Sequence, residues 1–192
     1  QREQAWTWEH MALTRARVVA GDETLGAQVN AEIEAILALP RDGKKIRRDA
    51  AEMRDLIAKE KPAAGIWDLK LIPGGLIDLE FIAQVATLLG AVETDHRLTA
   101  TADILAHLKP DFAEPQARQE LCDALALYSV LTQTIRLCLT GSLDRDDVPP
   151  GLADLLLAST DLPDMAVLEA HVEETSRKVK RHFDLLLRGK RG

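Results

Sequence analysis

Apolar residues recur at spacings of three and four along most of this 192-residue chain, which is the period of an amphipathic α-helix. Glycine, proline and capping residues interrupt the pattern about once per helix length. We predict helices over about 1–20, 24–39, from an Asp42 cap to Pro62, 76–90, 98–108, 115–139, a short stretch through 155, and 164–188. No two segments alternate like paired strands. The expected fold is therefore all-α, a helical bundle of about seven to eight helices without significant sheet.

The predicted helices follow one another through short connections. No linker is long enough to separate two domains, so we expect residues 1–192 to form a single helical domain. The chain begins with Gln1 and not with Met. We therefore expect a fragment of a larger multidomain chain.

Composition narrows the possible partners. With 46% apolar and 29% charged residues the chain is typical of a folded protein, and no apolar run reaches the length of a membrane span. A net charge of −7 disfavours nucleic acid as the main partner, because phosphate binding needs clustered cations. Cys122 and Cys138 fall on one predicted helix, roughly 24 Å apart, so they cannot bridge each other. Unpaired thiols suit a reducing cytoplasm.

Two charged motifs invite a functional interpretation. "GSLDRDD", Gly141 to Asp147, holds Asp144 and Asp146 like the DxD pair that binds magnesium in nucleotidyl transfer. That chemistry needs a rigid strand, whereas these residues follow a helix stop, so a solvated turn is favoured. In the basic C-terminal helix, Arg177, Lys178, Lys180 and Arg181 could meet an anion. A solvated helix end favoured by the macrodipole is the simpler reading.

Histidine spacing offers no metal site. The sequence has no HExxH pattern, and its five histidines fall in different predicted helices or loops. They are His10, His96, His107, His171 and His182.

The first predicted helix is apolar on two sides. At 100° per residue, one face carries Trp8, Ala12, Arg15 and Val19. The opposite face carries Trp6, His10, Leu13 and Arg17. A helix with two apolar faces is usually held between two packed bodies.

The segment Trp67–Gln84, "WDLKLIPGGLIDLEFIAQ", contains a Pro-Gly-Gly break and two carboxylates. Apolar and polar side chains alternate over residues 66–72, which indicates an extended segment. In a helix from Leu76, the core stripe would be Ile77, Phe81, Val85 and Leu88. Asp78 and Glu80 would point about 200° apart, so they could not share a pocket.

Two interpretations of Asp78 stay open. The residues alone favour a carboxylate at a helix N-terminus, worth about 0.3–1 kcal/mol. Alternatively, the glycines let backbone approach a phosphate, with Lys70 supplying charge.

"AWTWEHMALTRARVVAGD" and "WDLKLIPGGLIDLEFIAQ" closely resemble segments of the glutamine synthetase adenylyltransferase family. The resemblance is strong over about residues 1–89 and rests on helical pattern beyond. It implies a bifunctional, cytoplasmic parent enzyme that uses ATP and magnesium to attach AMP to a tyrosine of glutamine synthetase, removes it again, and responds to the PII signalling protein.

The family is built as two halves, each a nucleotidyltransferase domain followed by a helical domain. This chain resembles the helical domain of the second, adenylylating half. The resemblance places the metal-binding carboxylates in the preceding nucleotidyltransferase domain. We therefore expect no catalytic or metal-binding residue in this chain, no bound cofactor and no activity of the fragment alone.

The same resemblance implies roles for particular residues. The candidates to face the nucleotide cleft are Arg15, Arg17, Lys70, Gly74, Gly75, Asp78 and Glu80. The first helix would pack on the preceding nucleotidyltransferase domain as well as on its own bundle. The alternative is a non-catalytic docking module that binds glutamine synthetase or PII.

Overall fold

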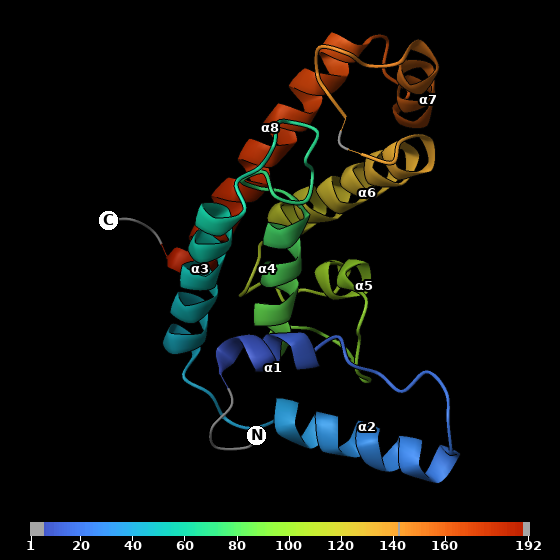
Figure 1. Ribbon diagram of the computed structural model, residues 1–192. Helices are drawn as coiled ribbons and strands as arrows, with labels where there is room; N and C mark the ends of the chain where they lie inside the picture. The colour runs from blue at the N-terminus through green and yellow to red at the C-terminus, as the bar shows by residue number, and fades with distance from the viewer. Residues whose placement is uncertain (1–5, 142, 190–192) are drawn as a thin grey trace.

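Helix α4 (Leu76–Leu88) runs through the centre of the structure, a computed structural model that describes residues 6–141 and 143–189 (Figure 1). Helices α1, α3, α5, α6 and α8 all contact it. The other helices are α1 (Thr7–Leu13), α2 (Glu23–Leu37), α3 (Gly43–Glu60), α5 (Thr101–Ala106), α6 (Pro115–Cys138), α7 (Pro150–Thr160) and α8 (Met165–Phe183), which continues into a π-helical turn, η1 (Asp184–Arg188). The all-α prediction is confirmed. Among the described residues the only β pairing is an isolated bridge between Val92 and Leu108.

The central position of α4 explains its composition. It buries Leu79, Ile82, Ala83 and Ala86 in addition to the stripe expected from the sequence, while Phe81 stays half-buried. The predicted stripe therefore includes too few of the buried positions of α4, because neighbouring helices surround this helix.

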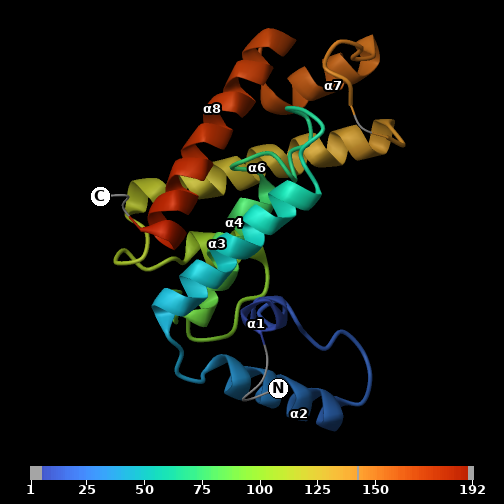
Figure 2. The same cartoon turned by 60° about the vertical axis from the view of Figure 1, so that its left-hand side comes forward.

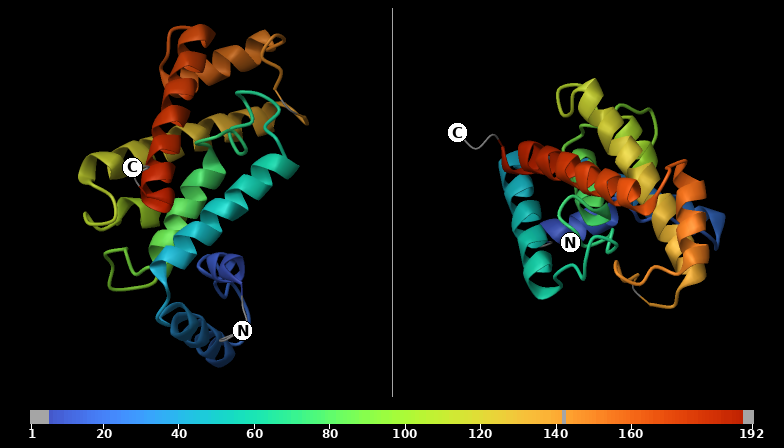
Figure 3. Two further views of the ribbon diagram at one scale, coloured as in Figure 1. Left: turned by 90° about the vertical axis from the view of Figure 1, so that its left-hand side faces the viewer. Right: turned by 90° about the horizontal axis from the view of Figure 1, so that it is seen from above.

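Helix α2 lies at the opposite end of the molecule from α7, below α1 (Figures 1 and 2). The left view of Figure 3 also separates the α2 end from the long crossing pair α6 and α8. On α2, Ile33 and Ile36 are buried, but Leu25 and Val29 are 59% and 41% exposed. Among the described residues, nothing thus covers the side chains of Leu25 and Val29, although Gly26 between them is buried beside Val18.

The first helix is shorter than predicted. Helix α1 ends at Leu13 instead of continuing to residue 20, and residues 1–5 lie outside the described part. After it, the Thr14 hydroxyl donates to the Met11 carbonyl, and Arg97 donates to the carbonyl of Ala16 at 2.6 Å. These bonds satisfy backbone groups that a longer helix would have used internally. The prediction that Arg15 and Arg17 lie on helical faces with the tryptophans is therefore wrong.

Residues 66–72 form turns and not the extended segment predicted. The Asp68 carboxylate accepts the Leu71 N–H at 3.3 Å, and the Asp68 carbonyl accepts the N–H groups of Leu71 and Ile72. An Asp that bonds the backbone ahead of it stabilises a turn, and this overrides the weak alternation.

Most predicted helix limits agree with the structure. The Asp42 carboxylate caps α3 through the N–H groups of Lys44 and Lys45, as expected. Helix α5 is shorter than predicted, and α7 extends beyond residue 155 to Thr160. Cys122 and Cys138 are both free.

Candidate functional site

The Asp78 carboxylate lies inside the bundle, bound to a residue that the sequence did not single out. The Nε of Arg54 on α3 donates to Oδ1 of Asp78 at 2.5 Å, and the two residues are 5% and 1% exposed. The Nη2 of Arg54 also donates to the carbonyls of Leu71 and Ile72, each at 3.1 Å. The Gly74 N–H donates to the other Asp78 oxygen. One buried ion pair thus ties α3, the 71–74 loop and α4 together.

Both charged groups of this pair are removed from water and hydrogen-bonded to protein groups. Burial raises the pKa of Asp78, while the Arg54 guanidinium and the Gly74 N–H act in the opposite direction. A signal for Arg54 was present in the sequence. It continues the Ile46–Ala50 spacing of four along the buried face of α3, where an arginine needs a partner.

The two glycines are required by close packing. Gly74 has a φ of +80°, and a Cβ built on it would lie 1.9 Å from the carbonyl oxygen of Ser176 on α8. A Cβ on Gly75 would lie 2.5 Å from the carbonyl oxygen of Leu69. Gly74 therefore lets the loop pass directly against α8, and Gly75 lets the loop fold back on its own residues 69–72.

Tyr128 on α6 is a second buried group that the sequence did not single out. Its side chain is fully buried, and its hydroxyl has no hydrogen-bond partner within the described residues. Burial raises its pKa, with the charge of Asp78 acting in the same direction.

Glu80 lies on a different side of α4, as the helical geometry predicted. It forms an ion pair with Arg15 at 3.2 Å, with the side chains 33% and 50% exposed respectively. The pair ties the segment after α1 to the central helix. Arg17 is exposed two residues further along. The structure thus brings Arg15 and Glu80 together but separates them from Asp78.

Lys70 lines another cavity, which we call the Lys70 groove. Its walls are the 64–70 turns, the C-terminal part of α6 and residues 141 and 143–145, and its volume is about 480 Å³. Arg136 and Arg145 also line it. Arg145 is held by Glu169 at 2.7 Å, whereas Lys70 and Arg136 have no ion-pair partner within the described residues.

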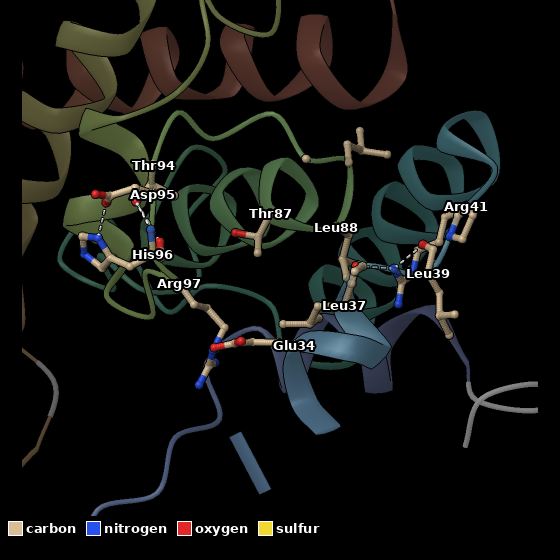
Figure 4. Close-up of a pocket in the computed structure, with 14 residues that line it drawn as sticks. Glu34, Leu37, Leu39, Arg41, Thr87, Leu88, Thr94, Asp95, His96 and Arg97 are labelled. Atoms are coloured by element: carbon tan, nitrogen blue, oxygen red, sulfur yellow. Dashed lines mark hydrogen bonds and ion pairs between the residues drawn. The ribbon is translucent and has the colours of Figure 1, made fainter. Parts of the chain in front are cut away.

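A groove of about 760 Å³ lies between the C-terminal end of α2 and the 94–97 loop (Figure 4). Arg41 donates to the carbonyls of Ile36 and Leu37 at 2.5 and 2.6 Å, which caps α2. Arg97 faces Glu34 across the groove at 4.0 Å. These cations hold the end of α2 and are already engaged by protein groups.

Charged groups of the acidic and basic motifs towards the C-terminal end bond to neighbouring protein groups. Asp144 accepts the N–H of Asp146 at 3.0 Å in an exposed turn. Lys178 pairs with Glu174, and Lys180 pairs with Asp184. Across residues 6–141 and 143–189, no three His, Cys, Asp or Glu side chains gather to hold a metal ion. No helix of that part combines the length and apolar character needed to cross a membrane.

The fold and the 67–84 segment thus define an all-α domain whose central helix is fixed by a buried Arg–Asp pair. Residues 1–32 match the family model described as glutamate-ammonia ligase adenylyltransferase, and residues 45–187 match the model described as GlnD PII-uridylyltransferase. The chain belongs to the glutamine synthetase adenylyltransferase family. Its residues 45–187 belong to the family described as GlnD PII-uridylyltransferase.

Named relatives are similar along the whole chain. A bifunctional glutamine synthetase adenylyltransferase/adenylyl-removing enzyme from Mesorhizobium japonicum is 64% identical over 191 residues, covering 100% of this chain. Enzymes of the same name from Brucella suis and Rhizobium meliloti are 51% and 45% identical, covering 97% and 95% of the chain. The chain spans 19% of the length of each of these three relatives.

Proposed function

We propose that this chain is a helical part of a bifunctional glutamine synthetase adenylyltransferase/adenylyl-removing enzyme. The observation that carries the proposal is the 64% identity over 191 residues with a relative of that name. The parent protein would act on glutamine synthetase in the cytoplasm, and so regulate nitrogen assimilation. The tyrosine hydroxyl of glutamine synthetase would displace pyrophosphate from ATP.

ATP and magnesium would be held elsewhere in the parent. The described residues contain no cluster of carboxylates, histidines or cysteines suited to a metal ion. Because the family resemblance places the metal-binding carboxylates in the preceding nucleotidyltransferase domain, we assign no catalytic step to this chain and expect the fragment alone to be inactive. Detectable AMP transfer to glutamine synthetase by the purified chain would overturn this expectation.

The 67–84 segment would hold the neighbouring elements in place and would take no direct part in the reaction. Asp78, Gly74 and Gly75 are committed to internal contacts that fix the loop before α4. Arg15, Glu80 and Lys70 keep solvent-exposed atoms. These side chains, with Arg17, are the ones that could reach a nucleotide cleft formed with a neighbouring domain.

The N-terminal face is the proposed contact with the nucleotidyltransferase domain. Trp6 and Trp8 are 71% and 50% exposed beside a groove of about 310 Å³, which Met53 and Leu56 also line. We call this the Trp groove. Residues 6–56 hold most of the large apolar side chains that the described part leaves exposed. Exposed tryptophans are costly unless a partner covers them, and this supports an interdomain contact.

A docking module for glutamine synthetase or PII is the second candidate function. The observation that favours it is the internal engagement of Asp78, which leaves the segment few groups for a nucleotide. In this case Lys70 and Glu80 would bind the partner protein.

AMP transfer by the full-length parent enzyme separates the two candidates. We would compare Lys70→Gln and Glu80→Gln with Lys59→Gln, an exposed control on α3. A lower kcat with unchanged KM for glutamine synthetase supports the cleft. An unchanged kcat with a raised KM supports docking. If both variants match the control in both constants, neither role holds.

A further inference from the structure

The N-terminal half of α3 concentrates positive charge in an acidic chain. Lys44, Lys45, Arg47 and Arg48 fall within five consecutive residues, although the net charge of the chain is −7. These residues occupy the first two turns of an 18-residue helix. Cations there oppose the helix macrodipole, whose positive end lies at the N-terminus. This arrangement destabilises the isolated helix, so an anion bound nearby would stabilise α3.

Three of these cations line one pocket of about 540 Å³, which we call the Arg47 pocket. Lys44, Arg47 and Arg48 follow the spacing of three and four that places side chains on one helical face. Arg188 closes the pocket from η1, but its charge is already balanced: it forms a two-point bond with Asp55, at 2.6 and 3.0 Å.

Arg47 is held in a fixed orientation. Its Nη1 donates to the carbonyl of Leu186, and its guanidinium lies 4.9 Å from the centre of the Phe112 ring. No described residue takes a hydrogen bond from its Nε or Nη2. Burial lowers the pKa of Arg47, so an anion beside it would offset part of the cost of desolvation. A half-buried guanidinium with spare, oriented donors is suited to bidentate binding of an oxyanion.

The flanking cations are available. Lys44 is exposed, and its ammonium has no ion-pair partner among the described residues. Arg48 lies 3.8 Å from Asp49, a long contact for an ion pair. Glu52 lines the pocket one turn beyond Arg48 and also lines the Trp groove, so this carboxylate marks the border between the two cavities.

We propose that the Arg47 pocket binds a phosphate group, with Arg47 as the oriented donor and Lys44 and Arg48 as flanking charges. Phosphate presents several oxygens to a planar guanidinium and to point charges at once, which matches this set. The group could be free phosphate or the phosphate of a monoester. The proposal is independent of the function proposed above.

The test is calorimetric titration of the 192-residue chain with inorganic phosphate, at constant ionic strength set with chloride. Circular dichroism would first establish that every variant is folded. We expect saturable one-site binding that the double variant Lys44→Gln/Arg48→Gln weakens about tenfold or more. The matched control, Lys59→Gln/Lys61→Gln, removes two exposed cations at the other end of the same helix and should bind like the unmodified chain.

Arg47→Lys is the sharper variant, because it keeps the charge and loses the planar fork. We expect it to weaken binding about tenfold as well. Amide chemical shifts should move on phosphate addition around residues 44–55 and 186–189. Absence of saturable binding, or equal weakening in both double variants, would overturn the proposal. A parallel titration with a nucleoside monophosphate distinguishes the sources: tighter binding supports a monoester, and equal or weaker binding supports free phosphate.

Discussion

Arg54 and Asp78, 24 residues apart in the sequence, form a buried ion pair with 2.5 Å between Nε and Oδ1. The pair joins α3 to the first turn of the central helix and bonds the loop between them at two carbonyls. Removing one partner would leave the other charge buried and alone. The conspicuous aspartate of the 67–84 segment is thereby a structural anchor.

Asp78→Asn should lower the free energy of unfolding by about 3–5 kcal/mol, the usual cost of breaking a buried pair. Urea unfolding followed by circular dichroism would measure it. Glu80→Gln, at the half-exposed pair with Arg15, should cost less than about 1 kcal/mol. Equal losses in the two variants would contradict a special role for the buried pair.

Gly74→Ala should destabilise the chain by about 2–5 kcal/mol, because a Cβ meets the Ser176 carbonyl and the φ of +80° is strained for alanine. Thermal unfolding would report the loss. Gly65→Ala is the control, since a Cβ there has nothing within 4 Å. Its effect should stay within about 1 kcal/mol. A tolerated Gly74→Ala would show that the loop can move away from α8.

Tyr128→Phe should leave stability unchanged or raise it by up to about 1 kcal/mol, because it removes a buried hydroxyl that has no partner among the described residues. Equilibrium unfolding in urea is the appropriate measurement. Tyr128→Leu, which also removes ring volume, should be clearly destabilising. A loss above about 1 kcal/mol in the Phe variant would mean that the hydroxyl bonds a buried water.

Acidification should weaken the contact between α6 and α8. The hydrogen bond from His182, at 2.6 Å, lowers the pKa of Glu120 from its ordinary value of 4.5. A lowered acid pKa adds stability that is complete above the unfolded value and is lost as pH falls through the folded one. The stability difference between the unmodified chain and Glu120→Gln should therefore shrink from pH about 6 to pH about 3.

The control for this pH series is Glu173→Gln. Glu173 is exposed on α8, and its carboxylate has no ion pair among the described residues. The difference in stability between Glu173→Gln and the unmodified chain should stay small over the whole pH series. A Glu120→Gln difference that does not change with pH would contradict the linkage.

Arg41→Gln should loosen the end of α2, because Arg41 donates to the carbonyls of Ile36, Leu37 and Leu39. Hydrogen exchange should accelerate roughly tenfold for amides of residues 33–39. Amides of α4 serve as the internal reference and should not change. Uniform acceleration across both helices would instead indicate global destabilisation.

Local sequence signals determined the helix inventory of this protein. The Asp42 cap begins α3, and the proline at position 115 begins α6, because caps and fixed φ angles act on their own neighbours. Helical geometry also placed Asp78 and Glu80 on different sides of α4. The two quoted segments, Ala5–Asp22 and Trp67–Gln84, were enough to indicate the family.

Tertiary structure decided what those residues contact. The partner of Asp78 is on another helix, Gly74 is needed because α8 crosses the loop, and α1 ends at Leu13 where Arg97 bonds the following backbone. Residues 66–72 turn because the Asp68 carboxylate and carbonyl capture nearby N–H groups. Such contacts join positions far apart in sequence or compete with a weak local pattern, so periodicity alone does not encode them.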